Sequence, residues 1–216
     1  MFESLTLVLA VGAVTLGSLH TLAPDHWVPF AALSRAQGWS RLRTARITAL
    51  CGFGHVTVSV VLGVLALAFG LEMLHVVGRR MESIAGLLLI AFGLVYAVLG
   101  LRRAAGERFH GHPHHHYDHV HEPSTMTPWA LFLLFSADPC VAVIPILFAA
   151  APLGVVRTIF VVCAYELATI ATMVVLVLPA RAAVNRLHAP WIARYGDAAA
   201  GAVIAAVGVL VAVLGI

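Results

Sequence analysis

Six long apolar runs dominate the sequence, and they constrain the fold more than any other feature. They lie near residues 4–24, 45–70, 81–102, 128–150, 154–179 and 196–216. A hydrocarbon core of about 30 Å is crossed by about 20 helical residues, so each run is long enough to span a membrane. The runs are rich in Leu, Val and Ala, without the alternation of a transmembrane barrel strand. The sequence therefore predicts an all-α integral membrane protein with six transmembrane helices.

Composition leads to the same class of protein. Hydrophobic residues make up 61% of the chain and charged residues only 11%, whereas soluble domains carry about 25% charged residues. The net charge of +3 is modest, so we expect the lipid bilayer, and no nucleic acid, as a partner. Glu3 precedes the first run and no small-residue cleavage site follows it, so we interpret this run as a true span and not as a signal peptide.

The arginines are unevenly divided between the two sides of the predicted membrane span. The loops after the first, third and fifth runs contain Arg35, Arg41, Arg43, Arg46, Arg102, Arg103, Arg108, Arg181, Arg186 and Arg194. The opposite side has only Arg79, Arg80 and Arg157. Basic loops stay in the cytoplasm, so both termini are predicted outside and the loop at 103–127 in the cytoplasm.

An internal repeat relates the two halves of the chain. Residues 85–100 and 200–215 align without a gap, and eight of their positions are identical. A weaker match sets the segment 51–57 against 163–169, and the same register sets His26 against Asp138. Each unit has three helices, an odd number, so the second copy must be inverted. We predict two inverted three-helix repeats, 1–102 and 128–216, joined by a His-rich loop at 103–127.

Small residues recur at seven-residue spacing in the third and sixth runs. The glycines are Gly86, Gly93 and Gly100 in one run, and Gly201, Gly208 and Gly215 in the other. Such stripes allow helices to approach closely. This stripe predicts either packing of the third helix on the sixth within the chain or contact between two chains. In the second case the protein would form a homo-oligomer.

The end of the first run carries two histidines and an aspartate around a proline. It reads His20-Thr-Leu-Ala-Pro24-Asp25-His26. On a regular helix Asp25 and His26 would lie about 140° and about 120° from His20, on opposite sides. Pro24 removes a backbone donor and disfavours helical torsions at Ala23. We therefore predict a break that turns the three side chains toward one point and frees carbonyls for a cation. The segment at 27–46, which follows this break, is predicted to contain a half-helix that re-enters the bundle.

Other polar residues lie inside the predicted spans. They are His55 in Gly52-Phe53-Gly54-His55, Asp138 and Cys140 around Pro139, and Glu166. We predict that the glycines beside His55 allow close helix approach and that Pro139 breaks the fourth helix much as Pro24 breaks the first. Ionisable residues in a membrane are costly and usually mark a pathway, although a hydrogen-bonded structural role is the alternative for each. Imidazole suits nickel, cobalt, zinc and copper, so histidines with carboxylates and without paired thiolates favour nickel or cobalt, with zinc next. Asp138, Cys140 and Glu166 are candidates for a contribution from the second repeat or for proton coupling.

The motif His20-x-x-x-x-Asp25-His26 resembles the HX4DH signature of nickel/cobalt transporters, and Gly54-His55 resembles the Gly-His element of their second helix. With the six-helix layout, these motifs are similar to the NicO-type branch, which includes urease-accessory-type membrane proteins. The resemblance implies metal contacts by His20, Asp25, His26 and His55, and a place in the bacterial inner (cell) membrane. The chain departs from the family in lacking the further acidic motifs of the eight-helix branch.

The loop at 103–127 also resembles the His-rich loop of bacterial efflux members, although it is shorter. Its histidines are His110, His112, His114, His115, His116, His119 and His121. A tract of this kind is typical of metal binding, and we expect it to collect metal ions weakly in the cytoplasm. The alternative is a polar linker whose histidines are incidental.

We expect a secondary transporter of Ni²⁺ or Co²⁺, with efflux favoured over uptake, rather than an enzyme, and with no prosthetic group. The motif GxxxxGK[ST] is absent, so the chain does not hydrolyse ATP itself. One alternative is a membrane thiol-redox carrier that uses Cys51, Cys140 and Cys163. The others are an accessory protein of a nickel enzyme such as urease, and a metal-dependent membrane hydrolase, for which no general base stands apart from the metal ligands.

Overall fold

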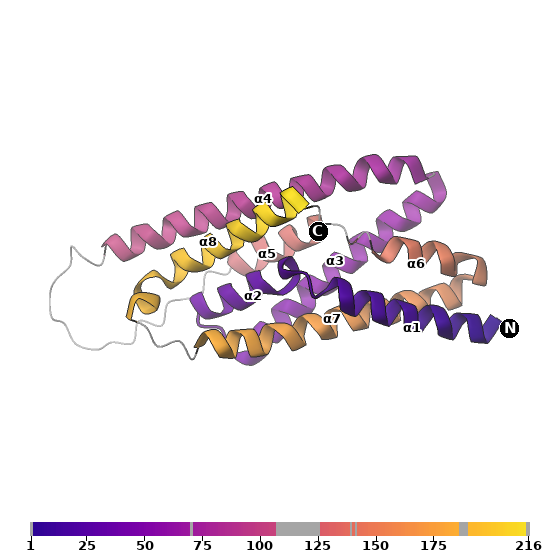
Figure 1. Ribbon diagram of the computed structural model, residues 1–216, viewed down its shortest axis with the longest axis horizontal. Helices are drawn as coiled ribbons and strands as arrows, with labels where there is room; N and C mark the ends of the chain where they lie inside the picture. The colour runs from indigo at the N-terminus through magenta and orange to yellow at the C-terminus, as the bar shows by residue number, and fades with distance from the viewer. Residues whose placement is uncertain are drawn as a thin grey trace.

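The computed structural model describes residues 2–69, 71–106, 126–138, 140, 142–185 and 190–214. This part of the chain is all-helical and contains no strand. In chain order the helices are α1 (Phe2–His20), α2 (Pro24–Ala36), α3 (Arg41–Phe69), α4 (Leu71–Gly106), α5 (Met126–Ala137), α6 (Val143–Ala150), the 3₁₀ helix η1 (Ala151–Leu153), α7 (Val155–Asn185) and α8 (Pro190–Leu214). They form an elongated bundle along one long axis (Figure 1).

Five of the helices are long and apolar enough to cross a membrane. These spans are Phe2–His20, Arg41–Phe69, Ile84–Ala105, Val155–Val184 and Arg194–Val213. Large apolar side chains such as Leu7, Val11 and Val156 point outward, as expected for a surface that faces lipid. The run predicted as a broken helix at 128–150 consists of two short apolar helices, α5 and α6. The described residues therefore contain five helices long enough to span a membrane and two shorter apolar helices, α5 and α6.

The first predicted break is confirmed at Pro24. Helix α1 ends at His20, four residues before the predicted end, and Pro24 is the first residue of α2. Ala23 has φ −57° and ψ 135°, outside the helical region, which the ring of a following proline disfavours. Proline is favourable at the first position of a helix, where its missing N–H leaves no bond unmade. Pro24 thus ends one helix and starts the next. The half-helix predicted within 27–46 corresponds to α2, which begins three residues earlier, at Pro24.

A second break separates α5 from α6. Helix α5 ends at Ala137 and α6 begins at Val143. The connecting backbone is held from outside, because the amide of Cys140 donates a hydrogen bond to Ser59 Oγ of α3 at 2.5 Å. Each half of the chain therefore contains a broken helix pair followed by two long helices.

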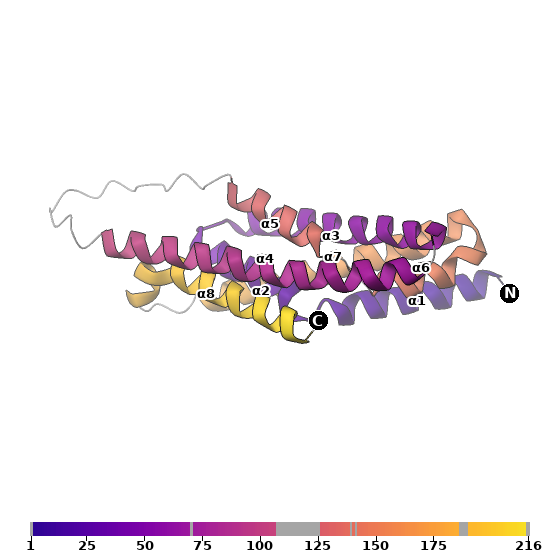
Figure 2. The same ribbon diagram turned by 90° about the horizontal axis from the view of Figure 1, so that it is seen from above.

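Helices α4 and α8 lie side by side over much of their length, as both views show (Figure 1 and Figure 2). A Cβ added to Gly93 would overlap the backbone of Gly201 and Ala205. One added to Gly86 would lie 3.0 Å from the amide nitrogen of Ala212. The predicted glycine stripe therefore packs these two helices within the chain, although Gly215 lies outside the described residues.

A polar group closes the end of the bundle where α2 and α4 end and α8 begins (Figure 1). The Gln37 amide donates a hydrogen bond to the Tyr96 hydroxyl, which donates to Asp197 Oδ1 at 3.2 Å. Arg103 forms an ion pair with Asp197 at 2.7 Å. These contacts tie α2, α4 and α8 together at the end where most of the described arginines lie.

Candidate metal centre

Three imidazole rings meet where the first helix is broken. His20 is the last residue of α1, His26 is in the first turn of α2, and His55 comes from α3. The ring centroids of His20 and His26 are 4.4 Å apart, those of His26 and His55 5.1 Å, and those of His20 and His55 6.4 Å. His26 is 2% exposed and His55 1% exposed. The break thus brings together histidines that a continuous helix would keep on different faces.

The close approach of α3 to its neighbours depends on the glycines beside His55. A Cβ on Gly54 would lie 2.5 Å from Ser136 Oγ of α5, and one on Gly52 would lie 2.9 Å from the Met173 sulfur of α7. The prediction that these glycines allow close helix packing is therefore confirmed. Because these glycines have no side chains, α3 packs closely enough for His55 to lie between the two broken helix pairs.

Ring nitrogens in this cluster lack hydrogen-bond partners within the described part of the chain. They are Nε2 of His20, both ring nitrogens of His26, and Nε2 of His55. His55 Nδ1 lies 3.1 Å from the carbonyl oxygen of Phe135. A carbonyl only accepts, so Nδ1 carries the hydrogen and Nε2 keeps its lone pair. Buried polar atoms are nearly always paired, so this concentration of unpaired nitrogens indicates a ligand site.

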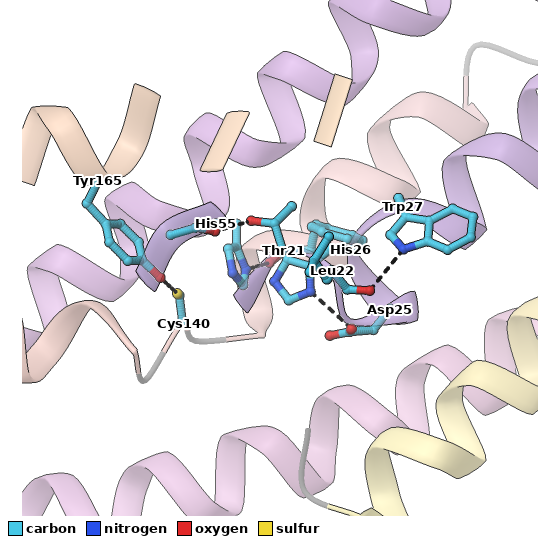
Figure 3. A network of polar contacts seen from close by, with 10 residues as sticks. Thr21, Leu22, Asp25, His26, Trp27, His55, Cys140 and Tyr165 are labelled. Carbon is cyan, nitrogen blue, oxygen red and sulfur yellow. Dashed lines mark hydrogen bonds and ion pairs between the residues drawn. The ribbon is translucent and has the colours of Figure 1, made fainter. Parts of the chain in front are cut away.

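Asp25 supports the cluster through His26. It is 4% exposed, and its Oδ1 lies 3.0 Å from His26 Nδ1, close enough for an ion pair but without the direction of a hydrogen bond. Figure 3 shows this contact beside His55 and Cys140. A carboxylate that accepts a hydrogen bond from a ligand imidazole fixes the ring and raises its basicity, and Asp25 is close enough to His26 to take this role after a small reorientation. The negative charge also lies in the first turn of α2, where the helix dipole favours it.

Cys140 reaches the same point from the second broken helix pair. One ligand atom each from His20, His55 and Cys140 forms a set within 4.8 Å of one another. The Cys140 sulfur is 2.8 Å from the Tyr165 hydroxyl of α7 (Figure 3). Ser59 and Tyr165, which position Cys140, were not predicted as part of the site. The signal for Ser59 is its place one helical turn after His55, and for Tyr165 it is a hydroxyl inside a span, where it needs a partner.

The other two candidates from the second half lie differently. Asp138 is half-buried in the same break as Cys140. Glu166, next to Tyr165 on α7, is half-buried, and its Oε1 has no hydrogen-bond partner within the described residues. Neither belongs to the set formed by His20, His55 and Cys140.

The backbone at the first break is already occupied. Five carbonyl oxygens there accept hydrogen bonds from protein donors, namely those of Gly17, Leu19, His20, Leu22 and Ala23. Each of these oxygens therefore already has a protein partner, and the prediction that the break supplies carbonyls to a cation stays a prediction. Side chains are the ligands that this site offers.

The three cysteines are free and differently placed. Cys51 is buried in an apolar cluster with Phe30 and Met173, whereas Cys140 belongs to a separate cluster with Val161 and Tyr165. Cys163 is exposed on the outer surface of α7.

The loop histidines lie outside the described residues, so their predicted metal binding stays a prediction. They are His110, His112, His114, His115, His116, His119 and His121.

No protein-family model, no curated protein and no solved structure matches the chain. What the site does must therefore follow from its own chemistry. It offers imidazole nitrogens with free lone pairs, one carboxylate and one thiol, enclosed by apolar helices, and such a donor set suits a divalent transition-metal ion.

Proposed function

We propose that this protein is a secondary transporter of a divalent transition-metal ion, Ni²⁺ or Co²⁺, in the bacterial inner (cell) membrane. The observation that carries the proposal is the group of unpaired imidazole nitrogens of His20, His26 and His55, buried where α1 and α2 are separated. Discontinuous helices with polar groups at the break are a recurring form of substrate site in transporters. The motifs that resemble the NicO-type family lie at this same point.

The transport mechanism that we propose is alternating access between two inverted repeats. The order of a broken helix pair followed by two long helices supports this, because it occurs in both halves of the chain. If each broken pair counts as one crossing, the chain has the six crossings that the sequence predicts. The substrate site lies between the two breaks, where a rocking motion of one unit against the other would expose it to either side. The arginine-rich end then faces the cytoplasm.

Proton coupling follows from the ligand chemistry. A metal ion binds neutral imidazole, so metal and protons compete for the same nitrogens. Asp138 or Glu166 would carry the exchanged proton, and efflux is the direction that we favour. A transport rate that is indifferent to a pH gradient would contradict this part of the proposal.

The thiol-redox alternative has less support. It needs cysteines that act together, yet Cys51 and Cys140 lie in separate apolar clusters and Cys163 is exposed on the outer surface. An accessory role for a nickel enzyme would use the same metal site and differs from transport only in the destination of the ion.

The test is accumulation of nickel and cobalt in cells that express the wild type, His20→Ala or Asp25→Ala at matched levels. We expect the wild type to change accumulation, downward for efflux, and both variants to abolish the change. Thr15→Ala is the control, because Thr15 is an exposed residue of α1 whose hydroxyl donates a hydrogen bond to the carbonyl of Val11. Equal accumulation in wild-type and empty cells for nickel, cobalt and zinc would overturn the proposal.

A further inference from the structure

We propose that Cys140 is a metal ligand and that the transported ion binds to a mixed set of two imidazoles and one thiolate, from His20, His55 and Cys140. The inference rests on the proposed transport function and names the ligands and the substrate class of that site. This ligand set joins the two broken helix pairs, because His20 ends α1 and Cys140 lies between α5 and α6.

The distances fit a tetrahedral ion after a small closure. Metal–nitrogen bonds of about 2.0–2.1 Å and metal–sulfur bonds of about 2.3 Å place tetrahedral ligand atoms roughly 3.4–3.6 Å apart. The three ligand atoms here lie within 4.8 Å of one another, so an approach of roughly 1 Å completes the geometry. Side-chain rotation supplies such a movement without a change of fold.

Each of the two imidazoles has a nitrogen available to the ion. The bond from His55 Nδ1 to the Phe135 carbonyl leaves Nε2 as the ligand atom, which is the arrangement of most metal-binding histidines. His20 Nε2 is buried and has no partner within the described residues. A bound ion would satisfy both nitrogens at once.

Cys140 is held in place by two outer contacts. Its amide donates to Ser59 Oγ, and Ser59 Oγ in turn donates to the His55 carbonyl at 2.7 Å. The same turn of α3 therefore sets the position of His55 and of the cysteine. The Tyr165 hydroxyl, 2.8 Å from the sulfur, donates to the thiolate and stabilises its charge beside the ion. When the ion binds, the S–H bond breaks, a sulfur–metal bond forms, and the proton leaves to bulk water.

The donor set determines which ions fit. Thiolate is a poor ligand for magnesium, calcium and manganese, and a site with nitrogen and sulfur in tetrahedral geometry suits zinc and Co²⁺. His26, whose ring is 4.4 Å from that of His20 between centroids, is the nearest imidazole for the fourth position. We therefore infer that Co²⁺ and Zn²⁺ bind at this site in preference to hard cations.

The test is the absorption spectrum of the purified full-length protein in detergent on addition of Co²⁺. Thiolate bound to Co²⁺ gives a charge-transfer band in the near ultraviolet, separate from the visible bands that report tetrahedral Co²⁺ with any ligands. The chain has three cysteines, so the double variant Cys51→Ser/Cys163→Ser keeps Cys140 as its only thiol. We expect the charge-transfer band in the wild type and in this double variant, and its complete loss in Cys140→Ser.

Binding strength gives a second readout. In Cys140→Ser we expect a rise in the Co²⁺ dissociation constant of at least the roughly 10–100-fold that loss of an outer-shell partner causes. Tyr165→Phe is expected to keep the band and weaken binding less. Because the double variant does not alter Cys140, the result does not depend on Cys140→Ser folding.

The outcomes separate the two proposals. Visible Co²⁺ bands without a charge-transfer band in the double variant would overturn the role of Cys140 and leave the imidazole site standing. An absence of Co²⁺ binding by the wild type would contradict the proposed function as well.

Discussion

Gly93→Leu is expected to prevent the protein from folding, while Gly12→Leu is expected to fold normally. Even a Cβ at Gly93 would overlap the backbone of Gly201 and Ala205, so α4 and α8 would have to separate. Overpacking typically costs about 1–3 kcal/mol where side chains can adjust, and backbone atoms yield less than side chains. Gly12 of α1 faces outward with nothing within 4 Å of its added Cβ.

The measurement is the yield of monodisperse protein by size-exclusion chromatography, together with thermal unfolding in detergent. A Gly93→Leu variant that matches Gly12→Leu in both would show that the packing of α4 on α8 contributes little to the fold. Gly93→Ala is expected to give an intermediate result, because its single methyl group demands a smaller separation of the helices.

His55→Gln is expected to retain the fold and lose tight metal binding. Glutamine is similar in length, and its amide can donate to the Phe135 carbonyl as His55 Nδ1 does. It does not supply the lone pair of Nε2, so one of the metal's imidazole ligands is removed. We expect the Co²⁺ dissociation constant to rise by about 100-fold or more. This is at or above the largest loss of metal affinity that is typical when a residue supporting a ligand is mutated.

Isothermal titration of detergent-solubilised protein with Co²⁺ measures this change. Thr57→Ala is the matched control, since Thr57 lies two residues away on α3 and faces outward. Equal affinities for His55→Gln and Thr57→Ala would mean that His55 has a structural role only.

The membrane class and the first helix break could be predicted from sequence because each depends on local chemistry. Long apolar runs need lipid, and Pro24 disfavours helical torsions at Ala23. The proline alone does not decide the break, because Pro29 and Pro179 lie inside helices α2 and α7. The glycine stripe at Gly86, Gly93 and Gly100 was recognised by its spacing, but spacing alone did not distinguish contact within the chain from contact between chains. That choice depends on how α8 returns along α4, which is a property of the whole fold.

The break predicted at Asp138-Pro139-Cys140 within the run 128–150 is confirmed, but that prediction rests on the proline and not on hydropathy. Apolar composition continues through α5 and α6, so hydropathy does not report that the helix stops at Ala137 and resumes at Val143. The position of Cys140 beside His20 and His55 could not be predicted from the sequence, because it depends on long-range packing. Cys140 is more than 80 positions from either histidine, and its approach to them depends on how the second broken helix pair packs against α3.

The most direct test of transport through the His20 site is metal flux into liposomes that contain the purified protein and a trapped fluorescent metal indicator. We predict that Co²⁺ added outside enters wild-type liposomes faster than protein-free liposomes, and that His20→Ala reduces entry to the protein-free rate. Thr15→Ala should retain the wild-type rate, because its side chain lies on the outer surface of α1. Entry at the wild-type rate in His20→Ala would show that the ion does not pass through this site, and entry at the protein-free rate in the wild type would contradict transport itself.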